Sequence, residues 1–409
     1  MDSFLDSWVV HLFIMLLGYA TVFIPGYLLI RYLKSIKYEE NAGNSIISRL
    51  IISCVYGSDD WQLLDSNAGG TSPLKTTSSS SLRRALNLVF CVIGLQVSYL
   101  TWGILQEKIM TKEYIGLDLH ETGSFKESQF LVFVNRILAF LLAGAYLLVS
   151  KQPRHTAPLY KYSYCSFSNI MSSWCQYEAL KYVSFPTQVL AKASKIIPVM
   201  LMGKLVSGKS YEYYEYAVAL LISTGMTLFL FGSTTDSGKT GTSTTLSGVI
   251  ILVGYMAFDS FTSNWQGELF TTYKMSSVQM MCGVNLFSCL LTSVSLLQQG
   301  TFSVAFAFMV KFPVFLWDCI VLSVCSATGQ LFIYYTIATF GPVVFIIIMT
   351  VRQLLAILLS CIIYSHPVSL LAGFGITFVF MAIFLRIYCS HRVKQLKKRR
   401  TAAQDAIRA

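Results

Sequence analysis

Eleven mostly apolar stretches, each about as long as a membrane-crossing helix, recur along this chain and restrict the folds open to it. A helix needs about 20 such residues to cross roughly 30 Å of hydrocarbon. Only 12% of the 409 residues are charged, whereas a soluble domain has about a quarter. Because backbone in lipid must satisfy its own hydrogen bonds, the stretches are predicted helices of an all-α membrane protein. They are residues 9–31, 85–106, 130–150, 158–181, 187–206, 213–232, 246–265, 276–298, 316–338, 342–364 and 367–388.

The first span stands apart from the other ten, because a long polar stretch containing NAGGTSPLKTTSSSS follows it. Such polar, low-complexity sequence is typical of a disordered linker. Acidic residues precede the first span, basic residues follow it, and no small-residue cleavage site is evident, which favours an uncleaved anchor. We therefore predict a membrane anchor (1–40), a partly disordered polar linker (41–83), two five-helix repeats (84–233 and 234–390) and a basic tail (391–409).

Basic residues gather near the C-terminus, where HRVKQLKKRR holds six lysines and arginines. Since Lys and Arg are enriched in cytoplasmic loops, the C-terminus is predicted to be cytosolic. Because ten is an even number of crossings, the start of the ten-helix core, beside Arg83 and Arg84, is also predicted to be cytosolic. The tail is interpreted as a topology signal, and contact with anionic lipid is the only further role that we expect of it. We expect no nucleic-acid partner, because no aromatic-interleaved RNA motif accompanies the charge.

Neither the cysteines nor the histidines form a pattern with chemistry of its own. The ten cysteines are scattered and lie mostly inside the predicted spans, without a disulfide framework or metal-ligand spacing. The five histidines avoid the middle of the core spans, and no Ser-His or paired-carboxylate arrangement is evident. We expect no enzymatic activity, no metal and no cofactor.

Two segments of the core share a weak pattern. SSWCQYEALKYVSFPTQVLAKASK ends at Lys195, and SATGQLFIYYTIATFGPVVFIIIMTVR ends at Arg352. Each contains a glutamine, an aromatic-rich stretch, a proline and then a cation nine or ten residues after that proline. The segments cover the third and fourth and the eighth and ninth core helices. Because five is an odd number of crossings, the second five-helix unit enters the membrane from the side opposite to the first. The pattern therefore favours inverted repeats, with a binding site at the bilayer midplane and transport by alternating access.

A cationic cluster is predicted where these segments end. Each lysine at a helix centre costs roughly 2.5 to 3.5 kcal/mol on insertion scales, so a cation kept there calls for an explanation. Gln188, Lys192 and Lys195 share one helix face, and Arg352 and Gln353 are their pseudo-symmetric counterparts. Arginine offers a bidentate fork to phosphate or sulfate, and lysine offers a mobile point charge. We therefore expect an anionic ligand.

Two interpretations without a ligand stay open for the lysines. Lys192 or Lys195 could snorkel toward the headgroups, or could pair with an intramembrane acid such as Glu178 or Asp259. A receptor or scaffold would not require midplane cations at repeat-related positions, so we favour a carrier over those classes.

Five longer motifs surround these positions: GLQVSYLTWGILQEKIMT (94–111), SSWCQYEALKYVSFPTQVLAKASKIIPVMLMGKLVS (172–207), FDSFTSNWQ (258–266), KMSSVQMMCGVNLFSC (274–289) and MTVRQLLAILLSC (349–361). Together they closely resemble the nucleotide-sugar transporter family, solute carrier family 35, subfamily B, over roughly residues 84–390. The resemblance implies a ten-helix drug/metabolite-transporter fold, here with one extra N-terminal membrane helix. It also implies a multi-pass Golgi antiporter that brings in cytosolic 3'-phosphoadenosine 5'-phosphosulfate (PAPS) for lumenal sulfation and returns adenosine 3',5'-bisphosphate (PAP).

A nucleotide also needs a flat surface for its base and amides for the base edge. Packing is the commoner role of an aromatic residue, and interhelical hydrogen bonding explains the amides equally well. The candidates are Tyr99, Trp102 and Tyr177 for stacking, and Gln96, Gln176, Asn264 and Asn285 for the base edge.

The rival function is exchange of another nucleotide, either ATP for ADP or a UDP-sugar. PAPS carries roughly four negative charges, which the predicted cluster of Lys192, Lys195 and Arg352 nearly balances. Selection among nucleotides depends on geometry that the sequence does not give, so the rival stays open, as does a homodimer.

Overall fold

The computed structural model is nearly all helical, and its chain divides into two compact units. Unit 1 comprises Met1–Ile170 and Trp265–Gly341, and unit 2 comprises Met171–Asn264 and Pro342–Ala409. Each unit therefore draws on both halves of the sequence. The structure describes residues 8–38, 45–57, 81–115, 122–125, 128–150, 156–179, 182–183, 195–208, 210–234, 246–298, 300–363 and 370–408.

The helical prediction is confirmed, because every predicted span overlaps a helix of the structure. The elements are α2 (Trp8–Ser35), α4 (Ile46–Val55), α6 (Ser81–Thr111), β1 (Glu113–Ile115), β2 (Thr122–Ser124), α7 (Ser128–Val149), α8 (Tyr160–Ala179), α10 (Ile196–Ser207), α11 (Tyr213–Thr234), α12 (Leu246–Tyr273), α13 (Ser277–Gln298), α14 (Thr301–Lys311), α15 (Pro313–Phe340), α16 (Pro342–Ile363) and α17 (Leu370–Arg408). Among the described residues, six helices are long and apolar enough to cross a membrane: α2, α6, α7, α12, α13 and α15. The protein is thus a multi-pass membrane protein.

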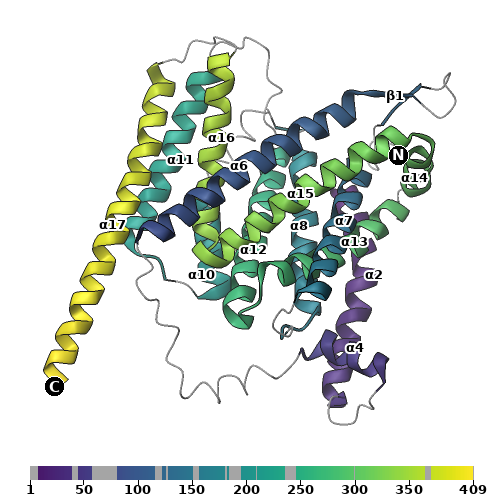
Figure 1. Ribbon diagram of the computed structural model, residues 1–409, viewed down its shortest axis with the longest axis horizontal. Coiled ribbons are helices and arrows are strands. Elements are labelled where there is room, and N and C mark those ends of the chain that lie inside the picture. The colour runs from purple at the N-terminus through teal and green to yellow at the C-terminus, as the bar shows by residue number, and fades with distance from the viewer. Residues whose placement is uncertain are drawn as a thin grey trace. The chain divides into compact units, whose positions relative to one another are not determined.

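Unit 1 is built on α7, α13 and α15, which contact one another, with α6 packed along α15 (Figure 1). Gly94 on α6 permits this close approach, because a Cβ there would overlap the ring of Phe332 on α15. The hydroxyl of Ser323 on α15 donates to Asn135 Oδ1 on α7 over 2.7 Å, and both side chains are buried. Close packing and buried polar bonds of this kind hold helices together in lipid, where burial of apolar surface gives little net stabilisation.

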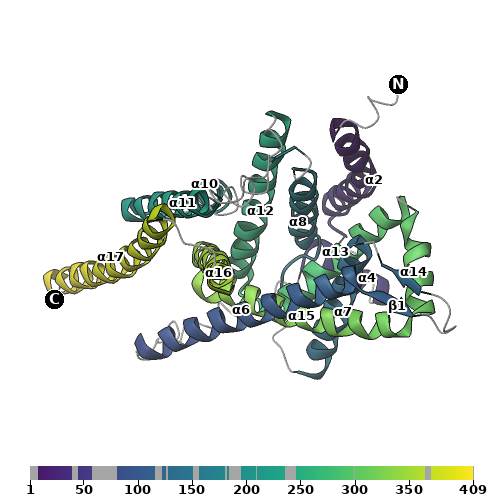
Figure 2. The same ribbon diagram turned by 90° about the horizontal axis from the view of Figure 1, so that it is seen from above.

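An aromatic cluster closes one end of unit 1, where the β1–β2 hairpin and α14 lie beside α15 (Figure 2). The strands pair antiparallel, with Tyr114 opposite Gly123. A Cβ at Gly123 would lie 3.0 Å from the ring of Phe312, so the hairpin rests tightly on the cluster. Phe125 and Phe315 pack with ring centroids 4.5 Å apart. The sequence did not predict this hairpin, which is a small exception to an all-α fold.

Asp318, near the start of α15, binds three groups from the end of α6 and from β1. Its carboxylate lies 3.2 Å from Lys108 Nζ and 3.6 Å from Lys112 Nζ, and the Tyr114 hydroxyl donates to it over 3.1 Å. Burial and the neighbouring carboxylate raise the pKa of Tyr114, so its hydroxyl keeps the proton that it donates. These contacts fix the end of one helix to the start of another far along the sequence.

Unit 2 contains a close helix pair, α11 and α17, which lie side by side in Figure 1. The backbones meet at Gly225 and Gly375. A Cβ at Gly225 would lie 2.8 Å from the Gly375 carbonyl oxygen, and a Cβ at Gly375 would overlap the backbone nitrogen of Phe229. Around this crossing, Met226, Phe229 and Val379 form a buried cluster. Two glycines thus permit a backbone approach that larger residues would prevent.

Three features differ from the simple span pattern. Helix α4 lies inside the predicted polar linker, and the Tyr56 hydroxyl beyond its end donates to the Leu33 carbonyl over 2.7 Å. Its ten residues, like the eleven of α14, are too few to register as a span. Helix α17 continues through the predicted basic tail to Arg408, since no glycine or proline follows the apolar part to end it.

Candidate functional site

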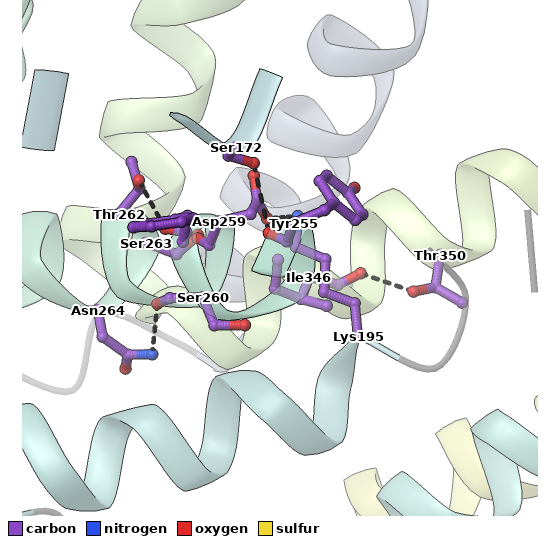
Figure 3. Close-up of polar contacts among 11 residues, drawn as sticks. Ser172, Lys195, Tyr255, Asp259, Ser260, Thr262, Ser263, Asn264, Ile346 and Thr350 are labelled. Carbon is purple, nitrogen blue, oxygen red and sulfur yellow. Dashed lines mark hydrogen bonds and ion pairs between the residues drawn. The ribbon is translucent and has the colours of Figure 1, made fainter. Parts of the chain in front are cut away.

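Lys195 and Asp259 form an ion pair inside unit 2 (Figure 3). Lys195 immediately precedes α10, so its predicted place near a helix centre is wrong, and Asp259 lies on α12. The ring of Tyr255, one turn before Asp259, has its centroid 6.0 Å from Lys195 Nζ. The two charged side chains are 16% and 24% exposed. Lys195 therefore has the acidic partner that the sequence raised as an alternative to a ligand.

Asn264, a predicted base-edge residue, is fully buried and ties α12 to α10. Its amide donates to the Val199 carbonyl over 2.8 Å and to the Ser260 carbonyl over 3.0 Å. Both amide hydrogens are thus used for bonds to backbone, one of them between helices. The Asn264 amide therefore makes the interhelical hydrogen bond that was the alternative to contact with a base edge.

Gly203 on α10 packs against the same amide, and its replacement by alanine should destabilise the protein by about 1 to 3 kcal/mol. A Cβ there would overlap the Tyr211 hydroxyl and would lie 2.8 Å from Asn264 Oδ1. The tyrosine can move aside, but the amide is held by two hydrogen bonds. The measurement is the thermal unfolding midpoint in detergent. Gly254→Ala is the matched control, because its Cβ would make an ordinary 3.5 Å contact with Cys175 Sγ; equal midpoints would contradict the packing.

The other cationic candidate of unit 2, Arg352, lies on α16, and that helix packs against α10. Arg352 is partly buried. Gln353 follows it on the same helix, and the structure does not describe its side chain. Gln188 and Lys192 lie outside the described residues, so their predicted place beside Lys195 stays a prediction.

The remaining candidates lie on three helices. Gln176 is partly buried on α8, and the side chain of Tyr177 beside it is not described. Gln96 and Tyr99 are partly buried on α6, in unit 1. The ring of Tyr99 meets Trp102 edge to face, with centroids 6.4 Å apart. The contact fits the packing role that aromatic residues commonly have.

Asn285, predicted as a base-edge residue, lies at the centre of a polar cluster in unit 1. It is fully buried on α13 and donates to the Met281 carbonyl over 2.8 Å and to Gln330 Oε1 over 2.7 Å. Its own Oδ1 accepts a 3.4 Å hydrogen bond from Arg136 Nη1. The cluster joins three helices, α7, α13 and α15.

Sequence reasoning missed Arg136 as a candidate residue. An arginine within the predicted span 130–150 is itself a signal, because ionisable residues inside spans are rare and commonly functional. The predicted cationic residues come from the paired segments that end at Lys195 and Arg352, and Arg136 belongs to neither.

Known proteins similar to this chain are transporters. The UAA transporter family matches residues 87–390. Adenosine 3'-phospho 5'-phosphosulfate transporter 1 of Drosophila melanogaster is 54% identical over 97% of this chain and 86% of its own length, and that of Homo sapiens is 50% identical over 99% and 93%. UDP-galactose/UDP-glucose transporter 5 of Arabidopsis thaliana is 40% identical over 78% of this chain and 90% of its own length.

One solved crystal structure has a similar fold, with a TM-score of 0.52 at 11% identity, over 75% of this chain and 98% of that chain. The family match spans all the helices from α7 to α16, including those that carry the Lys195–Asp259 pair and the Asn285 cluster. The match covers most of the chain, and the identity with the animal relatives extends over nearly all of it. This multi-pass membrane protein therefore belongs to the UAA transporter family.

Proposed function

We propose that this transporter exchanges cytosolic PAPS for lumenal PAP across the Golgi membrane, and so supplies the sulfate donor for lumenal sulfation. The observation that carries the proposal is the 54% and 50% identity, over nearly the whole chain, to two animal proteins named as transporters of this nucleotide. An anionic substrate also fits a chain that keeps Lys195 and Arg352 in apolar segments.

In this proposal the anionic groups of the nucleotide bind the cationic cluster of unit 2. Lys195 and Arg352 carry most of the interaction, assisted by Lys192, Gln188 and Gln353. Asp259 holds Lys195 while no nucleotide is bound, and a phosphate or sulfate oxygen replaces the carboxylate when the nucleotide binds. PAPS and PAP then compete for one set of cations, as exchange of the two requires. The adenine contacts predicted from the sequence, among them Tyr99, Tyr177, Gln96 and Gln176, remain part of the proposal.

The proposed mechanism is alternating access between two inverted five-helix repeats, 84–233 and 234–390. Its support is the pattern shared by the segments that end at Lys195 and Arg352, together with the five membrane spans that the sequence predicts in each repeat. The proposal also includes a cytosolic C-terminus, for which the basic residues of α17 are the support. A homodimer stays a prediction.

A rival substrate class has its own support, since a plant relative that is 40% identical is named as a UDP-galactose/UDP-glucose transporter. Uptake by proteoliposomes of the purified full-length protein separates the two. We expect saturable uptake of 35S-labelled PAPS that rises several-fold when the vesicles are preloaded with PAP, and little response to preloaded UDP-galactose. Uptake of UDP-galactose without uptake of PAPS would reassign the substrate, and uptake of PAPS that ignores preloading would refute exchange.

A further inference from the structure

Arg136 is a cation deep within a membrane span. It is the ninth residue of α7, so it lies about 12 Å along the axis from the start of a 22-residue helix. On insertion scales an arginine near a helix centre costs roughly as much as each lysine of the cationic cluster. Such a residue faces the interior of a helix bundle or a water-filled cavity, and it marks the path of an ion or substrate more often than not.

The guanidinium points into unit 1. Arg136 Nη1 donates to Asn285 Oδ1 on α13 over 3.4 Å, and the neutral side chains of Cys165, Cys289 and Tyr334 lie near its charge. These neighbours come from α8, α13 and α15. Arg136 therefore turns inward among helices. A lipid headgroup is a poor partner for a cation that lies so far along a membrane helix and points toward other helices.

The neighbours leave most of the binding capacity of the guanidinium unused. Arginine has five N–H donors, and the 3.4 Å bond to Asn285 is a long one. Within the described residues, no ion pair and no other hydrogen bond of Arg136 is present. Asn285 cannot swing away to improve the contact, because both of its amide hydrogens are bound, to Met281 and Gln330. A guanidinium held against neutral groups has the chemistry of an open anion site.

We propose that Arg136, positioned by Asn285 and Gln330, binds one phosphate group of the transported nucleotide. This anion subsite consists of residues other than those of the Lys195 cluster, and the identity of its ligand rests on the proposed function. A planar fork matches two oxygens of such a group, so arginine suits the position better than lysine. The amides of Asn285 and Gln330 are held in place and limit the rotation of the guanidinium. The site therefore favours a ligand whose charged group lies at one particular position.

The test is binding of four ligands to the purified full-length protein in detergent, measured by isothermal titration calorimetry. The ligands are PAP, adenosine 5'-monophosphate, adenosine 3'-monophosphate and adenosine, which differ only in their phosphates. Arg136→Gln should weaken PAP about 10- to 100-fold, as expected for loss of a charge-assisted hydrogen-bonded contact. It should also weaken one of the two monophosphates and spare the other and adenosine. The weakened monophosphate identifies which phosphate the arginine binds.

Two controls separate this subsite from a structural role. Ser323→Ala removes the neighbouring α7–α15 hydrogen bond to Asn135 without changing charge, and it should leave the ratio of PAP to monophosphate affinity unchanged. Arg136→Lys keeps the charge but loses the fork, so it should weaken PAP by a smaller factor. If Arg136→Gln does not fold, the selective loss in Arg136→Lys carries the test.

Equal weakening of all four ligands, or unchanged binding of all four, would overturn the subsite; unchanged binding is also what a lipid phosphate as the ligand would give. If the wild-type protein binds UDP-galactose and none of the adenine ligands, the proposed function fails by itself. The same variants are then titrated with UDP, uridine 5'-monophosphate and uridine. Selective loss for the phosphorylated ligands would support Arg136 as an anion subsite in that case too.

Discussion

Replacing Lys195 by alanine should lower PAPS uptake by proteoliposomes about 100-fold, the largest effect that we expect from any single change in the site. Hydrogen bonds to charged groups contribute about 1.5 to 3 kcal/mol, and each 1.4 kcal/mol is tenfold in affinity. The change also leaves the Asp259 carboxylate without the cation that it pairs with. An uncompensated negative charge then repels the incoming anion. Initial rates over a range of PAPS concentrations measure the effect.

Asp259→Asn should act in the opposite direction, because it removes the proposed competitor of the nucleotide for Lys195. Nucleotide affinity should rise by up to about tenfold, and more for PAP than for adenosine 5'-monophosphate, since the gain depends on ligand charge. Thr262→Ala is the matched control on the same helix, because the Thr262 hydroxyl donates to the carbonyl of Phe258, within α12. A Lys195→Ala/Asp259→Asn double variant should bind better than Lys195→Ala alone. If both single changes reduce affinity, the pair is structural and Lys195 is not released to the ligand.

Gly375→Val should prevent α11 and α17 from packing and should remove most of the folded protein. Any side chain at this position would overlap the backbone nitrogen of Phe229, and a backbone cannot rotate aside as a flexible side chain can. Overpacking commonly costs about 1 to 3 kcal/mol, and here the whole helix would have to move. The measurement is the yield of monodisperse protein by size-exclusion chromatography after solubilisation, together with the thermal unfolding midpoint.

Gly373→Val provides the control for that change. Gly373 lies two residues earlier on α17, and a Cβ there would have no described atom within 4 Å apart from its chain neighbours and the backbone of its own helix. The two variants make the same chemical change in the same helix, so helix propensity and hydrophobicity alter equally. We expect near wild-type yield for Gly373→Val. Equal losses in both variants would show that the Gly225–Gly375 contact is not what holds the two helices together.

The membrane helices were predictable because a span leaves a long signal, about 20 apolar residues, whatever lies around it. Helices α4 and α14 leave no such signal. They form on contacts with other elements, as when Tyr56 beyond α4 bonds the Leu33 carbonyl of α2. The β1–β2 hairpin likewise depends on the aromatic cluster beneath it. Short elements of this kind are fixed by tertiary contacts that periodicity does not reveal.

The charged residues of the site were easier to find than to pair. A lysine in an apolar segment is conspicuous, and so is an aspartate such as Asp259. However, the linear pattern does not indicate whether the partner of Lys195 is a ligand or the acid 64 residues away. The amides of Asn264 and Asn285 posed the same problem. Their hydrogen bonds to Val199 and Gln330 depend on the register between helices that are distant in sequence. Arg136 was missed for a simpler reason, since the predicted cations were those of a repeated pattern to which it does not belong.

The contacts that complete each unit also set the order in which a newly made chain can mature. Lys108 and Asp318 are 210 residues apart, so at about 5 to 20 residues per second the ribosome needs roughly 10 to 40 s to supply the second after the first. Within that interval Arg136 is translated well before Asn285, its hydrogen-bond partner, and Gln330 follows only after Asp318. In unit 2, α11 lacks its packing partner until α17, the last helix that the structure describes, has been made. Early helices therefore lack the contacts that complete their unit until late helices are made, and a mutation in α17 exposes surfaces of helices made long before it.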